Sequence, residues 1–416
     1  MQKLCMIRSY YFILLLFIFS ILSFPMMAQD KDIRSVQCFA GDNELLDPVI
    51  EFRGKDHVSL LFDDLNEDRG ALYYSLVHCD ADWKADGLFY SDYMEGFPEN
   101  PLRDYTLSFQ TRVNYVHYAL QIPNRDVQLK ISGNYLLKIY EKTPDKPILE
   151  QRFSVYEKAV NIVLNTRGPL QTGEDCLQQL EFSVQHPSLP VRDAFREFKV
   201  RVMQNGISLP GIALPVPSFI EQHVVSYTLA TNNWYPGGNE YRFLDIRTLE
   251  YGAQGVQQVR YDNQGVPYAL LTVDKSRERS SYSFIHDLNG KYRVEAYRMT
   301  NRHTEAEYVM TGFTLASEEY PDADVFVFGQ LSNYTLRPDF LMDYNVDGGA
   351  YELNVPLKQA YYNYRYVLVP RNQLPVWDAI EGCFAATENY YTVYVYYRSF
   401  RDRYDRLVGI RSTNSL

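Results

Sequence analysis

Short runs of β-branched and aromatic residues recur along most of this chain, at roughly ten-residue intervals and bounded by Gly, Pro, Asn or Asp. The most β-prone of them is Tyr390–Arg398, in which valine and tyrosine alternate. Such spacing is typical of β-sandwiches. The chain also contains 36 Tyr and 23 Phe, residues that fit pleated, half-buried surfaces. We therefore predict an all-β fold built from β-sandwich domains in tandem.

The first 28 residues have the features of a secretory signal peptide. Lys3 and Arg8 precede an apolar run from Tyr10 to Phe24, and this run is short for a membrane span. Ala28 supplies the small residue expected at a cleavage site. We predict an exported protein that is cleaved near Ala28, with no later segment that resembles a membrane-spanning helix.

The charge of the chain excludes one class of partner. Without the signal peptide, 39 basic residues stand against 52 acidic ones, a formal charge of −13. An acidic chain with no basic run is poorly suited to phosphate backbones, so we predict no binding to nucleic acid.

The length beyond the signal peptide exceeds what a single hydrophobic core usually holds. Breaks in the strand pattern predict three consecutive units. These are an N-terminal β-sandwich, a middle β-rich domain and a C-terminal domain, covering residues 29–157, 158–317 and 318–416.

The segment Ala71–Trp83 collects residues that could carry chemistry. His78, Asp80 and Asp82 would share one face of a strand, an arrangement that suits metal ligands. Cys79 and His78 would point to opposite faces, which does not suit a nucleophile and its base. We favour the interpretation of a buried strand that runs into a loop, with Trp83 covering the end of a sandwich. We therefore predict no metal site and no catalytic site here.

His117 and the group formed by Glu240, Arg242 and Asp245 could each serve either a functional site or the fold alone. His117 could complete a metal site with His78, but a single histidine on an aromatic strand is more often hydrogen-bonded and structural. Glu240, Arg242 and Asp245 could form a charge relay, but such residues more often fix a loop through ion pairs and main-chain bonds. The charged tract from Asp274 to Ser281 is predicted to be a solvated loop.

Four cysteines follow the signal peptide, and an exported protein may form disulfides. Cys38 and Cys79 are the pair expected to share a domain, so a Cys38–Cys79 bond is the candidate, although a domain of this size does not require one. Cys176 and Cys383 belong to separate predicted domains.

The C-terminal unit resembles the early-set, immunoglobulin-like modules related to glycogen- and starch-binding domains. The resemblance rests on an ordered series of segments: Val325–Gly329, Leu331–Tyr334, Gly349–Leu353 and Tyr362–Tyr366. Tyr334 stands where those modules have a tryptophan that stacks on sugar. This likeness gives the alternative function, an exported carbohydrate-binding accessory protein.

Ordered motifs across the whole chain resemble the plug protein of the type IX secretion system. The segments that carry this resemblance are His78–Trp83, Tyr115–Tyr118, Ser132–Lys138, Gly238–Arg242, Leu357–Tyr364, Ile380–Cys383, Val395–Arg398 and Asp405–Gly409. The chain departs from the expected pattern at Tyr241, Ala360 and Cys383. The resemblance implies a periplasmic protein without cofactor or enzymatic activity, associated with the outer membrane, that binds the β-barrel translocon and occludes its periplasmic mouth.

Two surfaces are candidates for contact with such a partner, because rigid aromatic anchors give binding energy at a small entropic cost. One is the strand face that presents Tyr394, Tyr396 and Arg398, opposite a valine-bearing face expected to lie in the core. The other is the glycine-bearing loop that contains Trp234, Tyr235 and Glu240.

Overall fold

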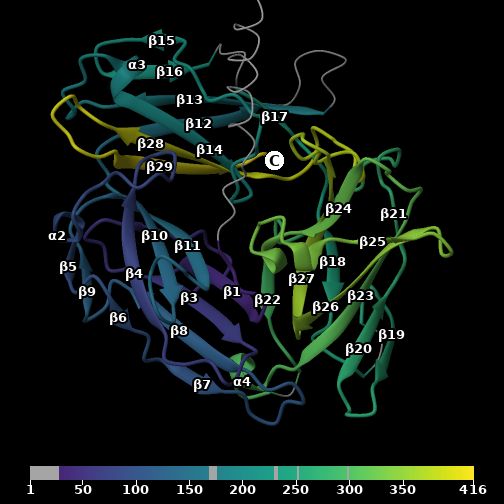
Figure 1. The fold of residues 1–416 in the computed structure, drawn as a ribbon. Coiled ribbons are helices and arrows are strands. Elements are labelled where there is room, and N and C mark those ends of the chain that lie inside the picture. Colours follow the sequence, from purple (N-terminus) through teal and green to yellow (C-terminus); the bar gives the residue numbers. More distant parts are fainter. Residues whose placement is uncertain (1–27, 168–175, 229–232, 251–252, 298) are drawn as a thin grey trace, which may run out of the picture.

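The computed structural model describes residues 28–167, 176–228, 233–250, 253–297 and 299–416 (Figure 1). Apart from Ala28, the predicted signal peptide lies outside these residues. Within them the chain forms 29 strands and only short helices, which confirms the all-β prediction. The helices are α2 (Tyr90–Tyr93), α3 (Ala194–Glu197), α4 (Arg302–Glu305) and the 3-10 turns η1 (Gln330–Ser332) and η2 (Pro338–Phe340).

The first domain, residues 28–157, is a sandwich of two sheets. One has the order β1 (Ile33–Ala40), β3 (Val58–Asp64), β8 (Val116–Ile122) and β7 (Tyr105–Leu107). The other has the order β2 (Val49–Glu51), β11 (Leu149–Tyr156), β10 (Gly133–Tyr140), β4 (Tyr73–Cys79) and β6 (Asn100–Pro101). A ribbon of β5 (Met94–Gly96) and β9 (Val127–Leu129) flanks them. Apolar side chains of both sheets, such as Phe62 and Tyr135, form one core.

The second domain is discontinuous, because strands from both sides of the third domain build it. Its first sheet has the order β12 (Asn161–Arg167), β13 (Leu177–Gln185), β16 (Val224–Tyr227) and β15 (Phe219–Ile220), and β17 (Trp234–Pro236) also pairs with β13. Its second sheet joins β14 (Phe198–Gln204) to the C-terminal strands β28 (Tyr390–Tyr397) and β29 (Arg406–Asn414). We define this domain as residues 158–236 and 385–416.

The third domain, residues 237–384, is inserted into the second. One sheet contains β18 (Arg242–Asp245), β27 (Ala360–Pro370) and β22 (Tyr292–Val294), with β24 (Ala323–Phe328) also paired to β27. The other has the order β19 (Val256–Tyr261), β20 (Pro267–Leu271), β23 (Tyr308–Ala316), β26 (Ala350–Lys358) and β25 (Asp343–Asn345), and β21 (Asp274–Lys275) pairs with β23. Both sheets contribute to one hydrophobic core.

The strand pairing corrects the predicted boundary between residues 317 and 318. β23 ends at Ala316 and pairs along its whole length with β26, so that boundary would divide one sheet. The predicted 318–416 module would also separate β28 from β14, its antiparallel partner. Hydrogen bonding between strands far apart in sequence therefore sets the domains, and in Figure 1 the yellow C-terminal strands lie beside teal β14.

Burial of β28 also corrects the predicted exposed face. Tyr391, Val393 and Val395 face the core of the second domain, as expected of the valine-bearing face. Tyr394 and Tyr396 are only 5% and 2% exposed, because they pack against Ala81 of the first domain and Leu407 of the neighbouring strand β29. A strand with both faces covered reads as a continuous apolar run, and this accounts for the β-prone sequence of β28.

Candidate functional site

The loop that contains Trp234, Tyr235 and Glu240 lies between the second and third domains and does not form a free surface. Trp234 is half-buried, and Tyr235 and Glu240 are buried. Glu240 Oε1 accepts hydrogen bonds from the Tyr282 hydroxyl at 2.6 Å and from the Glu388 amide at 3.1 Å. A Cβ on Gly237 would lie 2.1 Å from a main-chain oxygen of the facing segment, so only glycine fits there. The prediction of an adaptable partner-binding loop is therefore wrong for Tyr235 and Glu240.

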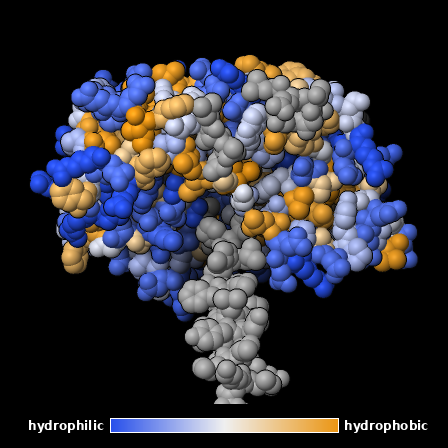
Figure 2. All heavy atoms as spheres, turned by 90° about the horizontal axis from the view of Figure 1, so that it is seen from above, coloured by the Kyte–Doolittle hydropathy of each residue, from blue (hydrophilic) through white to orange (hydrophobic). Residues whose placement is uncertain are grey.

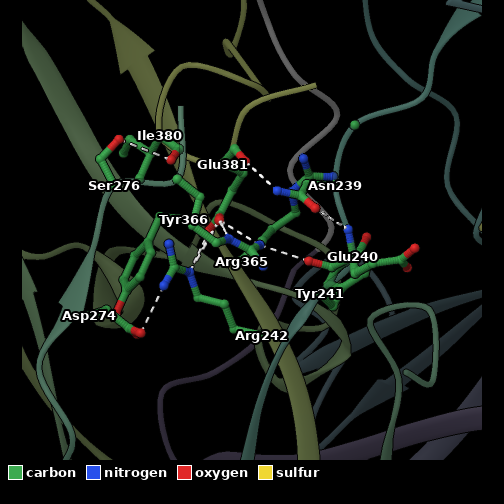
Figure 3. Close-up of polar contacts among 12 residues, drawn as sticks. Asn239, Glu240, Tyr241, Arg242, Asp274, Ser276, Arg365, Tyr366, Ile380 and Glu381 are labelled. Carbon is green, nitrogen blue, oxygen red and sulfur yellow. Dashed lines mark hydrogen bonds and ion pairs between the residues drawn. The ribbon is translucent and has the colours of Figure 1, made fainter. Parts of the chain in front are cut away.

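A buried charge cluster around Glu381 lies next to this loop (Figure 3). The Glu381 carboxylate is fully buried and accepts hydrogen bonds from Arg242 Nε at 3.0 Å and from Arg277 Nε at 2.7 Å. It also accepts one from the Tyr366 amide at 2.8 Å. Arg242 reaches in turn to Asp274 at 2.8 Å, so Figure 3 shows it between two carboxylates.

Electrostatics keep Glu381 and Arg242 charged. Burial alone raises the pKa of Glu381, but the two arginines and the hydrogen bonds outweigh burial and lower the pKa to about 2. Burial lowers the pKa of Arg242, and Glu381 and Asp274 outweigh that effect and raise it. The proposed relay among Glu240, Arg242 and Asp245 does not form, since Asp245 pairs with Arg247 at 2.7 Å. The interpretation of a loop fixed by ion pairs is confirmed.

The tract from Asp274 to Ser281 is mostly exposed, as predicted, but it contributes two side chains to the cluster. Asp274 and Arg277 are half-buried. Asp274 Oδ2 accepts hydrogen bonds from the hydroxyls of Tyr364 and Tyr366 at 2.7 and 2.8 Å. The rest of the tract is the solvated loop expected from its composition.

A disulfide joins Cys176 of the second domain to Cys383 of the third, with their Cα atoms 5.1 Å apart. This pairing corrects the Cys38–Cys79 candidate. Cys38 lies on β1 and Cys79 on β4, in different sheets, and both are free thiols. Burial raises the pKa of each to about 12, so neither thiol is activated.

Loss of the disulfide should destabilise the contact between these two domains. We expect Cys176→Ser with Cys383→Ser to lower the free energy of unfolding by about 2–4 kcal/mol, because the bond closes a long loop. Urea unfolding followed by tyrosine and tryptophan fluorescence measures this change. The unmutated protein treated with reductant is the matched control and should shift by the same amount. Alkylation of all four cysteines without reductant would contradict the pairing.

The first and third domains meet at a second buried charge pair. Lys358 Nζ donates to Asp63 Oδ2 at 2.7 Å and to the His303 carbonyl at 2.6 Å. The side chains of Lys358 and Asp63 are each about 1% exposed. His117 Nδ1 bonds Asp63 Oδ1 at 2.7 Å, which confirms the structural interpretation of His117. The Tyr308 hydroxyl donates to Asp63 Oδ2 at 2.7 Å.

His303 makes this contact sensitive to pH. Its ring stacks on that of His117 with centroids 5.0 Å apart. Burial, helped by the positive charges of His117, Arg302 and Lys358 and opposed by Asp63, lowers the pKa of His303 to about 4 from its ordinary 6.5. The unfolded chain therefore takes up this proton at a higher pH than the folded protein does.

Stability should consequently fall as the pH falls from about 6.5 to about 4. We expect His303→Gln to remove part of that decline, because glutamine does not titrate. Thermal midpoints measured across this range give the slope. His286→Gln, at an exposed histidine, is the control and should leave the slope unchanged. Equal slopes in the His303 variant and the unmutated protein would contradict the assignment.

The first and second domains meet on the inward face of β28. The Tyr396 hydroxyl donates to Asn134 Oδ1 at 2.9 Å. Asp405 Oδ2 accepts from the Ala81 amide at 3.0 Å and from Lys199 Nζ at 2.8 Å. Arg398, whose side chain is 40% exposed, lies at the rim and donates to a main-chain carbonyl at 3.0 Å. The face predicted to bind a partner is therefore mainly a contact between domains.

The residues considered as metal ligands, for which no metal site was predicted, have protein partners. His78 is buried and bonds Asp86 through Nδ1 and the Ser132 carbonyl through Nε2. Asp80 Oδ1 accepts from the amides of Asp82 and Lys84, so it caps the loop. Within the described residues, one group of three potential ligands lies close together, Cys176, Cys383 and Asp378, and its two cysteines are bonded to each other.

Tyr334 does not provide the exposed platform that sugar stacking requires. Its hydroxyl is buried without a hydrogen-bond partner among the residues that the structure describes, and its ring lies 6.1 Å from that of Phe328. The predicted starch-binding-like module is also not a separate domain, since its last strands belong to the second domain. The structure therefore gives no support to the carbohydrate-binding alternative.

Sequence reasoning did not single out Glu381, Lys358 or Asp63. The available signal was a charged residue inside or beside a strongly apolar run, as in Leu61–Asp64 and Leu357–Lys358. Burial of both partners decides whether such a charge becomes a structural ion pair, and local sequence does not report burial.

These contacts define a class of protein: an all-β scaffold whose buried ion pairs hold sandwich domains together. The family model for "Type 9 secretion system plug protein 1st domain" matches residues 33–157, which are nearly all of the first domain. The chain belongs to the type IX secretion system plug protein family and has a role related to type IX secretion.

Among solved structures, a hypothetical protein from Parabacteroides merdae is similar over almost the whole chain. The two are 32% identical, the match covers 94% of this chain and 99% of the other, and the TM-score is 0.89. The C-terminal domain of the Streptococcus pyogenes antigen I/II-family protein AspA, at 11% identity over 91% of this chain and 99% of the other, has a TM-score of 0.15, too low to support an argument. No curated protein matches the chain. In the part of the chain that the structure describes, no helix has the length and apolar character to cross a membrane.

Proposed function

We propose that this protein is the periplasmic plug subunit of the type IX secretion system. It binds the outer-membrane translocon barrel and occludes the periplasmic mouth of that barrel. The observation that carries the proposal, beyond family membership, is that each domain is fixed to the other two by buried polar or covalent contacts. A body that blocks a pore must keep its shape when the partner opens, and an arrangement locked in this way meets that need.

The three contacts are chemically distinct. The Asp63–Lys358 pair joins the first and third domains, Tyr396 and Asp405 join the second to the first, and the disulfide joins the second to the third. Buried hydrogen-bonded ions tolerate little displacement, because each loses its partner on moving away. Rigid-body binding is therefore the expected mode.

The exposed apolar side chains of the first domain are the proposed contact with the barrel. Five of them fall within residues 89–109 and are 59–76% exposed: Phe89, Phe97, Tyr105, Leu107 and Phe109. Strand β7, which carries two of them, is at the edge of its sheet. These residues are close in sequence, and exposed apolar side chains of this size are candidates for contact with a partner.

The second domain provides a comparison surface. Figure 2 looks onto it from above and shows apolar groups scattered among hydrophilic side chains. Leu214 and Phe219 of this domain are each 51% exposed. Substituting them shows the effect of losing exposed apolar side chains outside the first domain.

Affinity purification from membranes, with mass spectrometry of the co-eluting proteins, tests the function. We expect the translocon barrel to co-elute, and Phe97→Ser with Leu107→Ser to reduce its recovery at least about tenfold, because buried aromatic and aliphatic anchors dominate interface energy. Leu214→Ser with Phe219→Ser should leave recovery unchanged. Absence of the barrel from the unmutated sample would refute the plug function. Undiminished recovery with the first-domain variant would refute only the contact surface.

A further inference from the structure

A cavity of about 200 Å³ lies between the second and third domains. The second domain contributes Gln204, at the end of β14, and Pro236. The third contributes Tyr241, Arg365 on β27, and Trp377. Apolar residues such as Val376, together with the polar Asn205 and the acidic Asp378, complete the wall. The cavity is large enough for a single amino-acid residue and too small for most drug-sized ligands.

Arg365 is the unusual member of this wall. It is only 8% exposed, yet no carboxylate of the described residues pairs with it within 4.0 Å. Its Nη2 donates to the Trp377 carbonyl at 2.8 Å, and its guanidinium lies 5.4 Å and 5.9 Å from the ring centroids of Tyr241 and Trp377. Its Nε is buried with no hydrogen-bond partner. Buried charges are normally paired, and the other buried arginine of this region, Arg242, has two carboxylates.

Two further polar atoms of the same cavity wall are also unpaired. Trp377 Nε1 is buried and donates to nothing in the described structure, and Gln204 Oε1 is buried and accepts from nothing there. The orientation of Gln204 is fixed, because its Nε2 donates to the Pro236 carbonyl at 2.9 Å. The residues that line the cavity therefore carry two unused donors, one of them cationic, and one unused acceptor, all three buried.

These groups match a definite ligand chemistry. A carboxylate accepts from a guanidinium and an indole N–H, and an adjacent amide N–H can donate to a glutamine oxygen. The wall also contains one acidic residue, Asp378, but its carboxylate lies within 4.8 Å of the sulfurs of Cys176 and Cys383, beside the disulfide. We propose that this cavity binds an α-amido carboxylate with a small apolar side chain, as found in an N-acylamino acid or at the C-terminus of a peptide.

Isothermal titration calorimetry of the intact protein tests the proposal with three probes. They are N-acetyl-leucine, the peptide acetyl-Ala-Ala-Leu with a free carboxylate, and the same peptide as its C-terminal amide. We expect saturable binding of at least one acid, at least about tenfold tighter than binding of the amide, since the charge-assisted bonds to Arg365 require the carboxylate. Tighter binding of the peptide acid assigns the site to peptide C-termini, and tighter binding of N-acetyl-leucine assigns it to free acids.

Variants show whether the cavity is the site. Arg365→Lys removes the planar fork and should weaken acid binding at least about tenfold. Arg152→Lys is the matched control, because Arg152 also packs over a tryptophan, at 4.9 Å, and also has an unpaired Nε, but lies in the first domain. The Arg152→Lys variant should bind the acids as tightly as the unmutated protein does. Gln204→Glu retains the side-chain shape and adds a repelling charge, so it tests the site even if Arg365→Lys does not fold.

Three results would overturn the proposal: no saturable acid binding up to about 10 mM, equal binding of acid and amide, or undiminished acid binding in Gln204→Glu. The outcome does not depend on the plug function, because the titration uses the isolated protein and no translocon.

Discussion

Replacing Glu381 with glutamine is expected to lower the free energy of unfolding by about 3–5 kcal/mol, one of the two largest effects expected of a single change. Glutamine keeps the shape of the side chain but removes the charge that compensates Arg242, which is 9% exposed, and Arg277. A buried cation without its partner bears the full cost of its desolvation. Urea unfolding at neutral pH measures the change.

A matched surface variant controls for the loss of one negative charge. Glu295→Gln removes a carboxylate that pairs with Arg247 at 3.1 Å but is 45% exposed, so it should cost less than about 1 kcal/mol. A change of that small size in Glu381→Gln would show that Arg242 is compensated by Asp274 alone.

The effect of Glu381→Gln should depend on pH in a defined window. The folded pKa of Glu381, about 2, lies below its ordinary value of 4.5, so the stabilisation by the carboxylate is complete above about pH 4.5 and is lost as the pH falls toward 2. The difference between the variant and the unmutated protein should shrink over the same window. Most of this window lies below that of His303, and the two overlap only near pH 4.

The second large effect is expected at the contact between the first and third domains. Asp63→Asn should cost about 3–5 kcal/mol, because it leaves the Lys358 ammonium buried without a carboxylate. Burial raises the pKa of Asp63, but Lys358 and His117 outweigh burial and lower it, so the native carboxylate is charged at neutral pH. Unfolding in urea, followed by hydrogen exchange of β3 and β26, would locate the loss at this contact.

Lys358→Met should cost less than Asp63→Asn, since Asp63 would retain His117 and the Tyr308 hydroxyl as partners. The double variant should cost less than the sum of the two single changes, because the residues share one interaction. Asp126→Asn, at the exposed pair with Arg103, is the surface control. Strict additivity of the two buried changes would contradict direct coupling.

The sequence by itself determined the fold class and much of the local structure. Alternating apolar residues specify strands wherever one face is buried, so β4, β10 and β11 were recognisable from composition and period. Asp80 and His117 were correctly interpreted as structural residues, because strand ends and aromatic strands give such side chains nearby partners. The ordered motifs also identified the family.

Only the tertiary structure decided how these strands are grouped. Pairing of β14 with β28 spans nearly 200 residues, and no local pattern encodes a partner at that distance. The same long-range pairing brings Cys176 to Cys383, covers Tyr394 and Tyr396 with the first domain, and leaves Arg365 without a carboxylate. Periodicity shows that a strand has two faces, but what covers the second face depends on domains assembled from distant segments of the chain.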